Sequence, residues 1–272
     1  MAFSLERIFS PVTSAPPVLN GIAEIAPCDA LKPYVRCFWI SSGKPGVRVI
    51  PDMCGDIIIP LKENSRAVFC AAGRKSFLTE ASVPQFGIRF FAWAAPLFLQ
   101  ASASQLLDRQ VPACDVFARF SPIETQIKES SDLSVCIEKT QDYLISLLSG
   151  KELNPVALNA LSYAAGRECR ISVDDMARHC AVSARTLERN ILQSVGMTPR
   201  QMLGLVRYQL LWQECIRPEF NELDCTGRFG FFDQAHLCNS FKSYHGISPG
   251  EARAEFLALM RSFRTASVRI SD

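Results

Sequence analysis

The feature that most constrains this chain is a repeat in its C-terminal third. Gly196-Met197-Thr198-Pro199 returns 50 positions later as Gly246-Ile247-Ser248-Pro249. In each copy the glycine suits the left-handed position that ends a helix. The hydroxyl residue is a good cap for the next helix, in which proline takes the first position. The repeat therefore predicts two units in which one helix ends and another begins.

A helix precedes each of these glycines, and its key residues recur in both copies. Ser183 and its counterpart Asp233 stand where an N-cap accepts a hydrogen bond from the first turn. Apolar residues four positions apart then form an inward-facing pair. These pairs are Leu187 with Ile191 and Leu237 with Phe241, and Val182 before the first cap returns as Phe232.

A shorter helix and a tight turn precede the first of these helices. In the string SVDDMARH, Ser172 and Asp175 have the spacing of a capping box, and Met176 and Ala177 are predicted to face inward. Residues 180–182 supply the turn. Helix, short turn and helix is the layout of the DNA-binding motif whose second helix enters the major groove.

The segment between the two copies, Pro199 to Ile216, is an unbroken helical pattern. A helix of roughly 18 residues spans about 27 Å. This length is close to the roughly 34 Å between successive major-groove faces on one side of B-DNA. The sequence thus predicts two helix-turn-helix units on one stiff helix, placed to read adjacent grooves.

The segment 171–253 resembles the DNA-binding domain of AraC/XylS-type transcription regulators. The strings ISVDDMARHCAVSARTLERNILQSVGMTPRQML and GFFDQAHLCNSFKSYHGISPGEAR match its two units, and LVRYQLLWQEC matches its connecting helix. The resemblance covers roughly the last third of the chain. It implies a transcription factor, usually an activator, that binds double-stranded promoter DNA, contacts RNA polymerase and forms a homodimer.

Side chains opposite the apolar pairs are the candidates for reading DNA. Arginine can bind guanine through two hydrogen bonds, glutamate can accept from cytosine, and glutamine and asparagine suit adenine. Thr186 and Lys242 are candidates for phosphate contacts. The alternative for the charged residues is a solvated surface with arginines bridged to glutamate. The base-contact candidates are Arg185, Glu188, Arg189, Gln234, Ala235, His236 and Asn239.

The second unit departs from the family pattern. Gly227 stands inside the helix before its turn, at a cost of roughly 1 kcal/mol. Cys225-Thr226 replaces the usual apolar-alanine pair, and Asn239 stands where a basic residue is common. We therefore expect the first unit to supply most of the base specificity. An interaction module with reduced DNA binding is an alternative function.

The N-terminal half is rich in short β-type runs broken by Gly and Pro. Such runs predict antiparallel strands of a sandwich or barrel. They are YVRCFWI, VRVIP, DIIIPL, AVFCAAG and FGIRFFAW. Residues 94–110 are partly helical in pattern. Residues 123–149 have helical spacing, in a helix that either completes this domain or pairs with a second subunit.

The strings PCDALKPYVRCFW, VIPDMCGDIIIP and FGIRFFAWAAPLFLQASASQLLDRQVPACDVF resemble the sensory domains of one subgroup of AraC-type regulators. This resemblance implies a cupin-like barrel that holds a small-molecule effector or serves a dimer contact. Core packing is the alternative for the aromatic candidates, and turn or surface roles are the alternative for the charged ones. The effector-site candidates are Trp39, Arg48, Asp52, Asp56, Phe86, Arg89, Phe91 and Trp93.

These patterns predict an α+β chain with an N-terminal cupin-like antiparallel β-barrel and helices. Its C-terminal domain is all-α, with two helix-turn-helix units joined by a long helix. The expected parts are an arm (1–25), the effector or dimerisation domain (26–150), a linker and first helix (151–165), the DNA-binding domain (166–260) and a tail (261–272).

Composition narrows the function classes. The 3 histidines all lie at His179 or later, which excludes a histidine-ligated metal in the N-terminal half, and we expect no metal and no cofactor. The 11 cysteines show no CxxC spacing and are interpreted as reduced, packed thiols. A thiol-based redox or electrophile sensor is the open alternative.

An enzyme with an accessory AraC-like domain is a rival from another class. Such repair methyltransferases carry a Pro-Cys-His-Arg site, and the sequence has no such string. No apolar run approaches the roughly 18 residues of a membrane span. We therefore expect a soluble, cytoplasmic protein without enzymatic activity.

Overall fold

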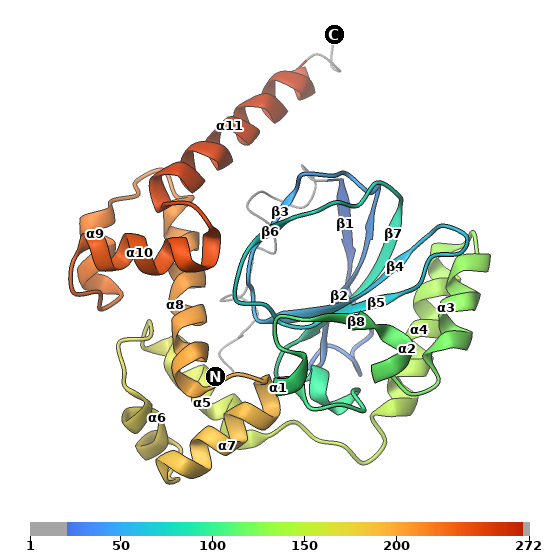
Figure 1. Cartoon of the computed structure of the whole chain (residues 1–272), viewed down its shortest axis with the longest axis horizontal. Helices are drawn as coiled ribbons and strands as arrows, with labels where there is room; N and C mark the ends of the chain where they lie inside the picture. The colour runs from blue at the N-terminus through green and yellow to red at the C-terminus, as the bar shows by residue number, and fades with distance from the viewer. Residues whose placement is uncertain (1–20, 269–272) are drawn as a thin grey trace.

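The computed structural model describes residues 21–268, in which a β-domain is followed by a helical domain (Figure 1). Six antiparallel strands form the main sheet in the order β1-β2-β7-β4-β5-β8. These strands are β1 (Ile22–Ile25), β2 (Val35–Ser41), β4 (Cys54–Pro60), β5 (Val68–Cys70), β7 (Gln85–Phe91) and β8 (Gln110–Pro112). The β3/β6 ribbon is a separate antiparallel pair of β3 (Arg48–Val49) and β6 (Phe77–Leu78).

All five predicted runs contain strands, which confirms the antiparallel character of this domain. The described strands do not close into a barrel, because β1 and β8 are the two edges of the main sheet. The end of the predicted arm is a strand, because Ile22–Ile25 pairs with β2 and so satisfies its backbone groups. The rest of the arm, residues 1–20, lies outside the described residues, as do residues 269–272 of the tail.

The main sheet has two faces of different character, because alternate side chains of a strand point to opposite sides. On β7, Phe86, Ile88 and Phe90 belong to a phenylalanine-rich core on one face. Gln85 and Arg89 line an internal cavity on the other. The sheet therefore separates a packed core from a space that is open to a ligand.

Helices follow β7 in the sequence, and two of them cover the phenylalanine-rich face. They are η3 (Ala95–Leu97), α1 (Ala103–Leu106), α2 (Ala113–Val116), α3 (Phe120–Glu129) and α4 (Leu133–Leu147). The single helix predicted over residues 123–149 is wrong. Residues 130–132 leave the helical conformation, and Asp132 caps α4 by accepting from the Ser134 amide at 2.8 Å. Ile127 and Leu144 pack on the sheet, so these helices complete the first domain.

The remaining helices form the C-terminal domain. They are α5 (Pro155–Gly166), α6 (Val173–His179), α7 (Ala184–Val195), α8 (Pro199–Cys215), α9 (Glu222–Arg228), α10 (Gln234–His245) and α11 (Pro249–Val268). Gly196 and Gly246 end α7 and α10 with φ of 81° and 87°, as predicted. Ser172 and Thr198 each begin a helix with a capping box. The last helix continues past the predicted domain end at residue 260.

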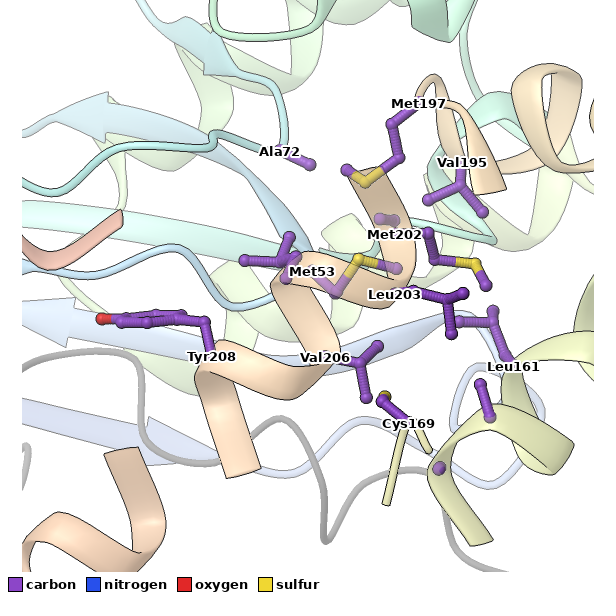
Figure 2. Packing of buried hydrophobic residues seen from close by; sticks show 14 of the residues in the cluster. Met53, Ala72, Leu161, Cys169, Val195, Met197, Met202, Leu203, Val206 and Tyr208 are labelled. Atoms are coloured by element: carbon purple, nitrogen blue, oxygen red, sulfur yellow. The ribbon is translucent and has the colours of Figure 1, made fainter. Parts of the chain in front are cut away.

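One hydrophobic core joins the two domains. Met53 and Ala72 of the β-domain pack against α8, where Met202 and Val206 are fully buried (Figure 2). Helix α5 lies in the region where the sequence analysis expects a linker and a first helix, and it packs against α6 and α7. The helical domain therefore begins with α5, and the connection between the domains is the short segment 148–154.

Candidate nucleic-acid interface and internal cavity

The first helix-turn-helix unit consists of α6 and α7. Ser183 accepts a hydrogen bond from the Thr186 amide at 3.1 Å, so α7 begins where the sequence predicts. Leu187 and Ile191 are fully buried, which turns the opposite side of α7 to solvent. The exposed residues on that side are Arg185, Glu188 and Arg189, and Thr186 is half-buried.

The second unit, α9 and α10, repeats this arrangement. Asp233 accepts a hydrogen bond from the His236 amide at 2.7 Å, and Leu237 and Phe241 are buried. The predicted candidates of this unit are all exposed: Gln234, Ala235, His236, Asn239 and Lys242. We call α7 and α10 the recognition helices.

Two of the exposed polar side chains on α10 already have partners. The Gln234 amide nitrogen donates to a Glu222 carboxylate oxygen at 2.6 Å. His236 Nδ1 accepts from the Phe232 backbone amide at 3.2 Å. One nitrogen of each of these two side chains is therefore engaged within the unit itself.

The turn of the second unit is one residue longer than that of the first. Residues 180–183 separate α6 from α7, whereas residues 229–233 separate α9 from α10. The Val182 amide donates to the Ala177 carbonyl, and the Phe231 amide donates to the Thr226 carbonyl in the same way. Phe231 is therefore the structural counterpart of Val182, and the pairing of Val182 with Phe232 is corrected.

The residues of α9 that depart from the family pattern fit the structure without strain. Gly227 is the penultimate residue of α9, and a Cβ there would meet no atom within 4 Å. The Thr226 hydroxyl donates to the Glu222 carbonyl at 2.8 Å, and Cys225 is buried. Because Gly227 lies at the helix end rather than in its interior, the second unit folds without the predicted interior penalty.

Both recognition helices end against the β-domain. A Cβ on Gly196 would lie 2.7 Å from the Ala103 carbonyl oxygen, so the end of α7 meets α1 closely. At the end of α10, the His245 carbonyl accepts from the Ser76 hydroxyl at 2.6 Å and from Arg48 at 3.5 Å. The opposite, N-terminal ends carry the base-contact candidates and point away from the β-domain (Figure 1).

A cavity of about 150 Å³ lies between the main sheet and the β3/β6 ribbon. Its walls are mainly apolar, and a buried charge cluster forms part of them. Arg89 pairs with Asp52 at 3.2 Å and with Asp56 at 2.6 Å. Trp39 donates its indole N–H to Asp56 at 2.8 Å. The structure thus brings together four predicted effector residues: Trp39, Asp52, Asp56 and Arg89.

Gly87 shapes this cavity, although the sequence analysis did not single it out. It stands opposite Trp39 in the pairing of β2 with β7. A Cβ on Gly87 would lie 1.9 Å from the Trp39 ring, so the indole occupies the space that a side chain would need. A glycine inside a strand often marks such a close approach, and this was the signal available in the sequence.

The other four effector candidates lie elsewhere. Phe86 is on the opposite face of the sheet, stacked against Phe38 in the phenylalanine-rich core. Phe91 and Trp93 stack on each other in the core that joins the domains. Arg48 turns toward the helical domain, where its Nε lies 3.4 Å from Glu255. Core packing, the alternative reading, therefore holds for the three aromatic residues.

Burial and charge oppose each other in the cavity cluster. Burial raises the pKa of Asp52, and the nearby Arg89 and Arg36 offset this only in part. Burial also acts to lower the pKa of Arg89, but the carboxylates of Asp52 and Asp56 hold it well above its ordinary value. Two arginines facing two aspartates leave the cluster balanced in charge, so its charges are already paired within the protein.

Each of the two domains matches a known protein-family model. Residues 176–255 match a helix-turn-helix domain family, over a range that spans the turn of each unit and all of α8. The helical domain of this chain therefore belongs to a helix-turn-helix domain family. Residues 23–112 match a domain of unknown function (DUF6597), which covers the main sheet and the ribbon.

A curated protein similar to this chain is the probable thc operon regulatory protein of Rhodococcus erythropolis. The two are 24% identical over 150 residues, which is 53% of this chain and 45% of the relative. The match thus spans less than half of the relative's length.

Several solved structures are similar in part. An AraC-type regulator from Chromobacterium violaceum is 26% identical, over 37% of this chain and 91% of its own, with a TM-score of 0.36. The DNA-binding domain of AdpA, in complex with target DNA, is 24% identical over 39% of this chain and 95% of its own, with a TM-score of 0.36. ToxT from Vibrio cholerae O395 is 10% identical over 86% of this chain and 95% of its own, with a TM-score of 0.38.

The cavity thiols of Cys54 and Cys70 are poorly suited to redox sensing. Burial raises the pKa of Cys70 to about 12 and that of Cys54 well above its ordinary value. Burial also raises the pKa of Cys37, to about 12. A reactive thiol needs a lowered pKa. The described residues also contain no group of His, Cys, Asp and Glu side chains that could hold a metal ion. No helix among them has the length and apolar character needed to cross a bilayer.

Proposed function

We propose that this protein is a cytoplasmic, effector-responsive regulator that binds specific promoter sequences through two adjacent major grooves. One observation carries the proposal: each end of α8 bears a recognition helix whose N-terminal half exposes base-contact candidates. The 17 residues of α8 span about 25 Å. That separation suits two units on one side of the duplex.

The two recognition helices differ in the contacts they offer. Arg185 and Arg189 present guanidinium groups for guanine or phosphate, and Glu188 between them suits cytosine. On α10, Asn239 suits adenine, whereas Gln234 first has to leave Glu222. Thr186 and Lys242 are placed for phosphate contacts. The first unit is thus expected to supply more hydrogen bonds to bases than the second.

The proposal is tested by selecting duplexes from a random-sequence pool with the full-length protein. A regulator of this kind enriches one motif with two half-sites about one helical turn apart. Its affinity for the selected duplex falls steeply with salt, with a slope reflecting roughly 6–10 phosphate contacts. Selection that enriches no motif would favour the interaction-module alternative instead.

The effector-responsive part of the proposal rests on the β3/β6 ribbon. Val49 and Phe77 of the ribbon line the cavity. The adjacent residues Arg48 and Ser76 bind the carbonyl end of α10. A ligand that moves one side of this two-stranded element also moves the contacts on its other side. A ligand with different affinity for two ribbon positions would therefore change the placement of the second unit.

The coupling between the cavity and α10 can be tested before the effector is identified, by enlarging a side chain that lines the cavity. Ile58→Phe adds volume inside the cavity and should change the affinity for the selected duplex. The same substitution in an Arg48→Ala, Ser76→Ala background should change it much less, because the ribbon no longer holds α10. An equal effect in both backgrounds would refute coupling through the ribbon. A homodimer and contact with RNA polymerase remain further predictions of the resemblance to AraC/XylS-type regulators.

A further inference from the structure

Phe232 is the most exposed large apolar residue of the described chain, with 91% of its surface accessible. It stands immediately before Asp233, the cap of α10. In the first unit the residue before the cap, Val182, packs onto the core instead. The longer second turn explains the difference, because Phe231 takes the packed position and Phe232 is left outside it.

The surroundings of Phe232 favour an apolar contact with DNA over a polar one. One nitrogen of each of the two nearby polar side chains is engaged, that of Gln234 by Glu222 and Nδ1 of His236 by the Phe232 amide. Ala235 in the first turn of α10 is exposed as well. The edge of α10 that would enter the groove first thus presents a phenyl ring and a methyl group.

We propose that the second unit recognises thymine through its C5-methyl group, with Phe232 as the residue that contacts it. The thymine methyl is the one apolar group that a base pair displays in the major groove, and phenylalanine and alanine are suited to cover it. Contact removes both apolar surfaces from water. This inference rests on the proposed DNA-binding function and assigns a specificity to its second half-site.

The test replaces thymine by uracil in the duplex selected by the full-length protein. Uracil lacks the methyl group but keeps every hydrogen-bonding group of the base. Each thymine in the half-site under α10 is replaced in turn, and the affinity is measured. We expect one replacement to weaken binding by about fourfold, because the duplex then lacks one methyl group that Phe232 would bury. In Phe232→Ser the same replacement should have no effect.

Two controls separate this contact from general effects. Leu223→Ser removes another exposed apolar residue of the same unit and should keep the full sensitivity to uracil. Uracil in the half-site under α7 should affect the wild type and Phe232→Ser equally. Because Phe232 is so exposed, its substitution should leave the melting temperature unchanged, which verifies the fold.

The outcomes distinguish the failure of this inference from that of the proposed function. If no duplex is selected, the DNA-binding proposal fails, and the thymine contact fails with it. If a duplex is selected and bound tightly, equal sensitivity to uracil in the wild type and Phe232→Ser overturns the thymine contact alone. A selected half-site under α10 that contains no thymine overturns it too.

Discussion

Arg185 and Arg189 differ from many arginines of this chain in having no ion-pair partner among the described residues. Arg89, Arg228 and several others hold carboxylates. The bridge to Glu188 that the sequence allowed does not form. The sequence was sufficient to predict this exposure, because a buried pair four residues apart fixes which side of a helix faces solvent.

Arg189→Ala should therefore weaken binding to the selected duplex by about 1–3 kcal/mol and relax specificity at one base pair. Lys139→Ala, on α4 of the β-domain, is a matched loss of one exposed positive charge. Its effect on affinity should be small and independent of sequence. Equal losses in the two variants, with unchanged base preference in both, would remove Arg189 from the list of base contacts.

His245 is a residue whose burial and pKa the sequence could not predict. It ends α10, where the helix dipole favours a positive charge. Its ring is nevertheless buried beside Trp212 and Phe241, and its Nδ1 shares a hydrogen bond with the Tyr208 hydroxyl at 2.8 Å. Burial lowers the pKa of His245 from 6.5 to about 3, with a smaller contribution from Arg48.

This shift predicts a stability that depends on pH. The unfolded chain binds the proton more readily than the folded one between pH 6.5 and about 3. His245 therefore costs no stability above pH 6.5 and progressively more as the pH falls through that window, about 2 kcal/mol by pH 5. Urea unfolding at pH 7 and pH 5 should show this loss in the wild type. In His245→Asn, which has no titrating ring, the loss should be smaller by about that amount, and identical losses would contradict the assignment.

At the scale of elements, the features that the sequence predicted were those that depend on neighbouring residues. The caps, the ends and the order of α6 to α10 were predictable, because each depends on residues within a few positions of one another. The pairing of β3 with β6 was not predictable, because it joins residues about 30 positions apart, which hydrophobic periodicity does not report. The break between α3 and α4 is local, and the Asp132 cap was the signal available for it.

The junction of α7 and α1 gives a test of how the first unit is held. Gly196→Ala combines a left-handed backbone with a clash against the Ala103 carbonyl. Gly150→Ala imposes a similar backbone strain, with φ of 71°, where no atom lies within 4 Å. We expect Gly150→Ala to lower the free energy of unfolding by about 1 kcal/mol and Gly196→Ala by clearly more. Equal losses in chemical denaturation would mean that α7 does not depend on this contact.

At the scale of the whole molecule, the two domains share a core that the sequence did not reveal. Phe91, Trp93 and Arg48 were assigned to an effector site because nothing local shows that they meet the helical domain. The shared core makes the β-domain part of the support for α8 and both recognition helices. The proposed link between the cavity and the candidate DNA-binding surface would act through this support.

The shared core predicts cooperative unfolding. Met53 is fully buried against α8 (Figure 2). Met53→Ala should lower the stability of the whole chain by about 2–5 kcal/mol. Tryptophan fluorescence, which reports Trp39 in the β-domain, Trp93 in the shared core and Trp212 in α8, should then show one transition together with circular dichroism. Separate transitions for the two domains in the wild type would contradict a common core.

Hydroxyl-radical footprinting of the full-length protein on its selected duplex is the most direct measurement of the central claim, which is that two recognition helices on α8 bind one face of DNA together. The predicted result is two protected segments about 10 base pairs apart on the same face, with Arg189→Ala weakening one segment and Asn239→Ala the other. A single protected segment, or protection that neither substitution alters, would contradict the claim.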